Sequence, residues 1–136
     1  MRFVFVLENK FWDWVLEKCS ATGQAWFGIW ILRHTKHSAT SFGQEIYRHE
    51  MIHIKQQREC LIVFFYVIYI GHFIENYINL SFNKSLYLNT GQKDSWWLRF
   101  WAAYRLITFE VEAYKYENMT TTAYFKIRPI FAWVRI

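Results

Sequence analysis

The sequence predicts a single, mainly α-helical domain with a small β element near its N-terminus, an α+β arrangement. Its 136 residues are enough to bury one hydrophobic core but not two. Apolar side chains recur at helical spacing in most of the chain, whereas Phe- and Trp-rich runs typical of strands precede residue 33. One Pro and five Gly leave little room for linkers or repeats. Residues 1–136 are therefore predicted to form one domain, closed by an extended or short helical tail from Thr120 to Ile136.

The N-terminal part is predicted to hold two strands and one helix. Arg2 to Leu7 is rich in Phe and Val, which favours a short strand. Asn9 is a candidate N-cap for a helix that runs through Cys19. Ala25 to Leu32 is apolar on both faces and predicts a strand that is covered on both sides.

A polar loop and the most amphipathic helix come next. The loop is predicted from Arg33 to Gly43, and its last part offers Thr40 and Ser41 as N-cap candidates. From Gln44 to about Arg58 the sequence has a helical period, with His and Gln side chains on one face and basic side chains on the other.

The polar face disappears beyond this helix. Leu61 to Ile70 is apolar all round and predicts a buried or membrane-dipping helix, with a bend at Gly71. The apolar run from Cys60 to Ile74 is about fifteen residues long, short of the roughly twenty that cross a bilayer. The many Asn and Ser side chains from Asn76 to Ser95 predict irregular structure, with room for a short strand at Ser85 to Leu88.

The last predicted helix is opened by Asp94 or Ser95 and runs to about Glu117. In its helical projection Glu110 lies on the side of the apolar residues, whereas Glu112 points about 200° away. We therefore expect Glu110 to face the interior and Glu112 to face solvent.

Composition and charge narrow the partners that the protein could have. Hydrophobic residues make up 54% and aromatic residues 22%, so some apolar surface is expected to face lipid. The net charge of +5 comes from scattered cations, which fits a negatively charged membrane surface and argues against nucleic acid. Cys19 and Cys60 show no C-x-x-C spacing. The apolar run at the N-terminus is too short for a signal peptide. We expect a location in the cytoplasm or at the inner face of a membrane, with the oligomeric state open.

The stretch from His49 to His53 reads H-E-x-x-H inside the predicted amphipathic helix. Two imidazoles four residues apart lie on one helix face, where both can reach one metal ion, while Glu50 flanks that ion. A catalytic zinc site needs three protein ligands and a bound water. His49, His53 and Glu110 are the candidate ligands, and Glu50 is the candidate base that takes the proton from the water.

Other readings of the same residues stay open. His49 and His53 could be ordinary core or surface histidines, and Glu110 could be a buried carboxylate paired with Arg or Tyr. Gln56 and Gln57 extend the polar face of the helix by one turn. The alternatives to Glu110 as third ligand are His34, His37, Glu112 and Glu117.

Two motifs together resemble a known family of proteases. They are His49-Glu50-x-x-His53-x-x-Gln-Gln and Phe109-Glu110-Val-Glu-Ala-Tyr114. The chain resembles a gluzincin-type metallopeptidase core, and more distantly the integral-membrane zinc proteases of the HtpX and CAAX-prenyl-protease group, whose second motif reads E-x-x-A-D. This resemblance implies that Glu110 binds zinc. Tyr114 stands where that family has an Asp that steadies a ligand histidine, and a Tyr cannot supply its charge.

A closer similarity is to a group of small bacterial proteins of uncharacterised activity. They share a strand before the motif, H-E-x-I-H-x-x-Q-Q, an aromatic apolar run and A-Y-R-x-I-x-F-E-x-E-A-Y, which here runs from Ala103 to Tyr114. This resemblance implies a zincin-like helical core, in which the H-E-x-x-H helix and the Glu-bearing helix pack together beside a small β element. The strand at Ala25 to Leu32 could then present an edge to an extended peptide.

These observations predict a small zinc-dependent peptidase that hydrolyses peptide or protein substrates with metal-activated water. The peptidase could also be associated with a membrane. Tyr114, Gln56 and Gln57 are expected to support the ligands from outside the metal shell. The alternative is a non-catalytic, zinc-stabilised module that binds a membrane or another protein. A third reading is a membrane-surface binder without metal. An open fourth coordination position favours the enzyme, and a fourth side chain such as Glu117 favours the module.

Overall fold

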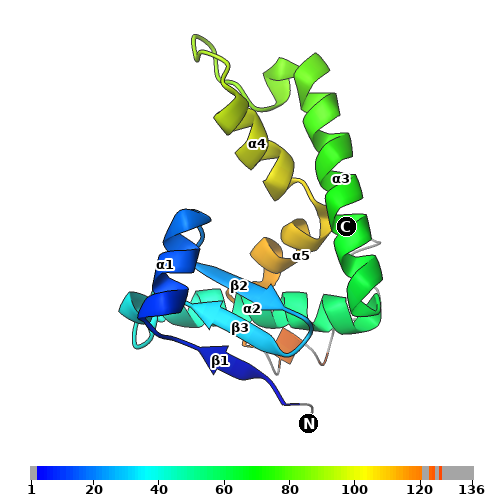
Figure 1. Ribbon diagram of the computed structural model, residues 1–136. Coiled ribbons are helices and arrows are strands. Elements are labelled where there is room, and N and C mark those ends of the chain that lie inside the picture. The colour runs from blue at the N-terminus through cyan, green and yellow to red at the C-terminus, as the bar shows by residue number, and fades with distance from the viewer. Residues whose placement is uncertain (1–2, 121–122, 125, 127–136) are drawn as a thin grey trace.

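The structure, a computed structural model, describes residues 3–120, 123, 124 and 126, so most of the predicted closing tail lies outside the described residues. The described part is mainly helical with one small sheet, which confirms the predicted class (Figure 1). Its elements are β1 (Phe5–Leu7), α1 (Lys10–Lys18), β2 (Gly23–Trp26), β3 (Trp30–Arg33), η1 (Thr35–His37), α2 (Ser41–Glu59), α3 (Ile62–Phe82), η2 (Lys84–Leu86), α4 (Trp96–Arg105) and α5 (Thr108–Tyr116).

The sheet has the order β1-β3-β2, with β3 parallel to β1 and antiparallel to β2. The single strand predicted from Ala25 to Leu32 is wrong, because this stretch is a hairpin whose two arms are β2 and β3. Phe27 and Gly28 turn the chain back, with φ angles of 53° and 70°. An extended strand cannot pass through two left-handed residues in succession. The aromatic run concealed this turn, and Gly28 was its only local signal.

The N-caps of the helices follow the predictions closely. The Asn9 side chain accepts hydrogen bonds from the backbone amides of Phe11 (3.0 Å) and Trp12 (3.1 Å) at the start of α1. Thr40 Oγ1 accepts one from Gly43 N (2.9 Å) at the start of α2. Each side chain satisfies amides that the first turn of a helix leaves without a partner. The predicted helix starts at Asn9 and at Thr40 are therefore confirmed.

The sharp bend of the chain lies at Leu61, not at the predicted Gly71. Leu61 has a φ of 53°, and it separates α2 from α3, which differ in direction by 112°. Gly71 instead lies inside α3, which rises from the end of α2 away from the sheet with α4 beside it (Figure 1). No single helix in the described part of the chain is long and apolar enough to cross a bilayer, and α2 and α3 pass that test only as a bent pair.

The irregular region is shorter than predicted, because α3 continues to Phe82. Leu80 is buried and the Asn76 side chain donates a hydrogen bond to Ala103 O (3.2 Å), so this part of the helix still packs on α4. The short strand predicted at Ser85 to Leu88 is wrong, since η2 occupies its first part.

The last predicted helix is two helices. Ser95 caps α4 as predicted, with its Oγ accepting from Leu98 N (3.2 Å). The chain then leaves the helix at Ile107, which has an extended conformation and no exposed surface. Ile107 and Phe109 enter a core cluster with the Cys60 thiol and Phe65. The break reorients α5, so the helical projection from α4 does not apply to it.

Candidate metal centre

Helices α2 and α5 pack against each other and bring His49, His53 and Glu110 together. Their exposed fractions are only 7%, 5% and 1%. One ligand atom from each lies within 4.8 Å of the others, so the predicted convergence is confirmed and the group could hold a metal ion. Among the residues that the structure describes, this is the one group of three or more His, Cys, Asp or Glu that does so.

The distances within this group are close to those between ligand atoms around one small cation. The Nε2 atoms of His49 and His53 are 3.1 Å apart. Glu110 Oε2 lies 3.2 Å from His49 Nε2, and Glu110 Oε1 lies 3.1 Å from His53 Nε2. Ligand atoms about 2.0–2.1 Å from a tetrahedral zinc ion are about 3.3 Å from one another. The three side chains are thus spaced as ligands of one small cation.

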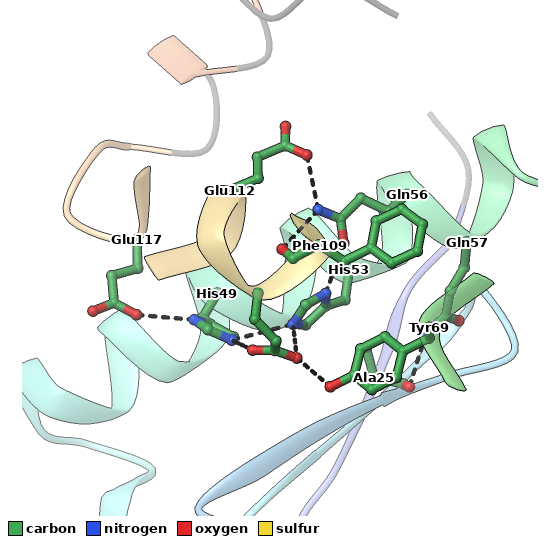
Figure 2. Close-up of polar contacts among 10 residues, drawn as sticks. Ala25, His49, His53, Gln56, Gln57, Tyr69, Phe109, Glu112 and Glu117 are labelled. Atoms are coloured by element: carbon green, nitrogen blue, oxygen red, sulfur yellow. Dashed lines mark hydrogen bonds and ion pairs between the residues drawn. The ribbon is translucent and has the colours of Figure 1, made fainter. Parts of the chain in front are cut away.

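A carboxylate determines which nitrogen of His49 faces the group. His49 Nδ1 donates a hydrogen bond to Glu117 Oε2 (2.9 Å), as Figure 2 shows. A carboxylate can only accept, so Nδ1 carries a proton and Nε2 is the atom left to bind a metal ion. Glu117 therefore supports His49 from behind and does not supply a fourth ligand atom on the Nε2 side.

An amide does the same for His53. Its Nδ1 donates to Gln56 Oε1 (2.7 Å), and the Gln56 amide nitrogen donates to Phe109 O (3.0 Å) and Glu112 Oε2 (2.8 Å) (Figure 2). Both acceptors fix the orientation of the Gln56 amide. The prediction that Glu112 faces solvent is wrong, because it has no exposed surface. The reason is that the Gln56 amide of α2 and the Tyr124 hydroxyl both donate to the Glu112 carboxylate and cover it.

With both Nδ1 atoms donating outward, two Nε2 atoms and a carboxylate converge in a buried space that favours a positive charge, either a proton or a metal ion. The pKa values of His49, His53 and Glu110 also favour a positive charge at this place. Burial would lower the pKa of His49, but hydrogen bonds to Glu110 and Glu117 raise it to about 10. Burial likewise opposes the charged form of His53, yet the Glu110 charge raises its pKa. Burial would raise the pKa of Glu110, and the two histidines hold it below its usual range instead.

Glu50 is a separate buried carboxylate beside this group. It lies under β2, where Gly23 comes so close to α2 that a Cβ atom there would meet Ile46 Cγ2 at 2.5 Å and Glu50 Oε1 at 3.2 Å. Burial raises the pKa of Glu50, while the histidine charges and a backbone hydrogen bond from Ala25 oppose that rise. A carboxyl group with a raised pKa beside a metal centre is typical of an acid–base residue.

Tyr114 and Gln57, the other two residues expected to support the ligands, differ in what they contact. The Tyr114 ring contacts the His49 ring edge to face, with 4.6 Å between centroids. Gln57 holds the hairpin instead of a ligand, since it accepts from Gly28 N (2.6 Å) and donates to Ala25 O (2.9 Å).

Three residues support the group in a role that was not predicted, although Glu112 and Glu117 were named as alternative ligands. The Tyr69 hydroxyl donates to Glu110 Oε1 (2.5 Å), and it lies in an apolar run that carries no signal for such a role. Glu117 follows Glu110 by seven residues, which is two helical turns. This spacing could have predicted that both lie on the same face of the helix. Glu112 had no such signal, because its burial depends on contacts with Gln56 and Tyr124, which lie outside its own helix.

The group opens into a cleft of about 570 Å³ between β2, α2, α3, α4 and α5. His49, Glu50, His53, Glu110 and Tyr114 all line it. Its volume lies in the range of small-molecule and peptide sites. No protein-family model, curated protein or solved structure matches the chain.

Proposed function

We propose that this protein is a zinc-dependent peptidase that hydrolyses peptide bonds with a water held at the centre of His49, His53 and Glu110. The observation that carries the proposal is the buried triangle of two Nε2 atoms and a carboxylate at 3.1–3.2 Å, which opens into a cleft. Two imidazoles and one carboxylate are the ligand set of many catalytic zinc sites. Carboxylate-only sites would favour magnesium or calcium instead.

The fourth position of such a centre is available to water and substrate. Glu117 and Gln56 bind the Nδ1 atoms, on the sides of the rings away from the triangle. No further His, Cys, Asp or Glu joins the triangle in the part of the chain that the structure describes. This favours a catalytic centre over a closed structural one.

Glu50 has the position and chemistry of the general base. It lines the cleft but is not one of the three converging residues, so its carboxylate is free to handle protons. A bound zinc ion would make the water acidic and polarise the substrate carbonyl. Glu50 would accept the proton from the water and donate it to the departing amine, which a buried carboxyl of raised pKa can do.

Substitution of Glu50 tests this role. Glu50→Gln should keep zinc and the fold but lose about 10²–10⁴-fold in hydrolysis of a quenched-fluorescence peptide library. His49→Ala and His53→Ala should lose zinc, measured by elemental analysis of the purified protein. Glu75→Gln, an exposed carboxylate on α3, is the control and should change neither. Unchanged hydrolysis in Glu50→Gln would refute the base, and the absence of bound zinc in the wild type would refute the metal centre.

A second candidate function is a non-catalytic, zinc-stabilised module that binds a membrane surface. The specific observation is the outer face of α3, where large apolar side chains are 50–71% exposed: Val63, Phe64, Val67, Ile70, Ile74 and Ile78. A net charge of +5 would favour anionic lipid, such as the inner face of a membrane. Co-sedimentation with phosphatidylglycerol vesicles tests it. Zinc and vesicle binding without hydrolysis of any peptide would favour this candidate over the peptidase.

A further inference from the structure

The cleft continues beyond the metal centre, and its two ends differ in chemistry. The two ends follow the direction of α2, along which Glu45, His49 and His53 lie in that order. The His49 end carries the carboxylates of Glu45 and Glu117. Aromatic side chains from three elements form a wall of the cleft that reaches His53 through Phe65: Trp26 of β2, Phe65, Tyr66 and Tyr69 of α3, and Phe100, Trp101 and Tyr104 of α4.

The aromatic wall begins at a metal-ligand candidate and continues without interruption. The Phe65 ring lies 6.3 Å from the His53 ring and 5.5 Å from Tyr69, measured between centroids. Tyr69 is 6.3 Å from Tyr104, which is 5.5 Å from Trp101. A side chain of a substrate bound at the centre would therefore meet Phe65 beside His53 and could extend along the wall to Trp101.

The tyrosine hydroxyls beside the wall are engaged in hydrogen bonds with other groups of the protein. The Tyr69 hydroxyl donates to Glu110, and the Tyr66 hydroxyl accepts from Phe27 N (3.5 Å). Tyr104 shares a hydrogen bond with Tyr69. The wall therefore offers ring faces to a ligand, which suits an apolar group and provides no partner for a charged one.

On the basis of the proposed function, we propose that the wall around Trp101 is a specificity pocket for a bulky apolar side chain next to the scissile bond. The substrate class is then peptides with Phe, Tyr, Trp, Leu or Met at one position beside the cleavage site. Binding energy from burying this side chain would place the carbonyl carbon over the metal centre.

The test compares peptides that differ at one residue. Cleavage sites in a mixed peptide library are mapped by mass spectrometry, and kcat/KM is then measured for Phe and Ala versions of one cleaved peptide. The wild type should prefer Phe by about 10-fold or more. Trp101→Ala should reduce that preference at least about 5-fold, with unchanged zinc content. Trp96→Ala is the matched control, since Trp96 lies on the same helix but is 66% exposed and does not line the cleft.

Trp101→Phe and Phe100→Leu serve as milder variants should Trp101→Ala not fold, and each should weaken the preference less. A wild type without preference for large apolar residues would overturn the pocket. Equal effects of Trp101→Ala and Trp96→Ala would overturn it too.

If no peptide is hydrolysed, the proposed function fails and the pocket is tested by binding alone. N-acetyl-phenylalaninamide should then shift the Trp101 indole resonance of the zinc-loaded protein in an NMR titration, and N-acetyl-alaninamide should not. Equal responses to both probes, or none, would overturn the pocket independently of hydrolysis.

Discussion

Glu117 and Glu112 support the two histidines through the Nδ1 atoms, on the sides of the rings away from the triangle. Glu117 binds His49 directly, and Glu112 reaches His53 through the Gln56 amide. Tyr114, which was expected to support a ligand histidine, contacts the His49 ring edge to face and supplies no carboxylate. The carboxylate is thus supplied one helical turn later, because residues seven apart lie on the same face of a helix.

Removal of the Glu117 carboxylate should weaken metal binding without changing the ligands. Glu117→Ala is expected to lower zinc affinity about 10–100-fold, because His49 loses the acceptor that orients its ring and makes it more basic. Glu117→Gln should recover part of the affinity, since its amide oxygen still accepts from Nδ1. Competition with a chromophoric chelator at neutral pH measures both. Wild-type affinity in Glu117→Ala would contradict this role, and Glu75→Ala is the control.

At the scale of elements, the centre depends on how closely β2 approaches α2. Gly23 permits this contact, and Gln57 holds the hairpin to the helix by hydrogen bonds to Gly28 and Ala25. The Ala25 backbone also faces Glu50 and Gln57, so these side chains occupy part of the β2 edge that was expected to receive a peptide.

Gly23→Ala should therefore destabilise the protein by about 1–3 kcal/mol, because the new methyl group would overlap Ile46 Cγ2. The matched control is Gly71→Ala inside α3, where nothing lies within 4 Å of the added Cβ. That change should stabilise by roughly 0.5–1 kcal/mol through helix propensity. Urea unfolding measures both free energies. Addition of Ile46→Ala should relieve part of the Gly23→Ala cost, and two equal effects in the single variants would contradict the close contact.

At the scale of the whole molecule, the proposed metal ion would compete with protons for the same buried acceptors. The metal-free protein holds a positive charge between His49, His53 and Glu110 by protonation, as the raised pKa of both histidines indicates. Zinc binding must displace that proton. Folding stability, pH and metal content are consequently linked in this protein.

The metal-free protein should lose stability as the pH rises from about 6.5 to about 10. The pKa of His49 is raised to about 10 from its ordinary 6.5, so its contribution is complete below 6.5 and disappears as the pH passes the folded value. Zinc replaces the proton, so the gain in melting temperature on adding zinc should grow over the same range. At a thousand times its Kd, zinc should add about 4 kcal/mol.

Differential scanning calorimetry of metal-free and zinc-loaded protein across this range checks the prediction. His49→Gln should abolish most of the alkaline loss, since no titrating group remains at that position. A zinc-induced gain that shrinks as the pH rises would contradict the competition.

The amino-acid sequence by itself determined the mainly helical class, the caps at Asn9, Thr40 and Ser95, and the shared helix face of His49 and His53. These features depend on a few consecutive residues, because helical period and capping are local. Only the tertiary structure decided that residues 25–32 fold back as a hairpin, that the chain leaves the helix at Ile107, and that Glu112 and Glu117 support the two histidines. The turn holds β2 to α2 and the break fills the core, so both depend on contacts between residues far apart in the chain, which no local pattern contains.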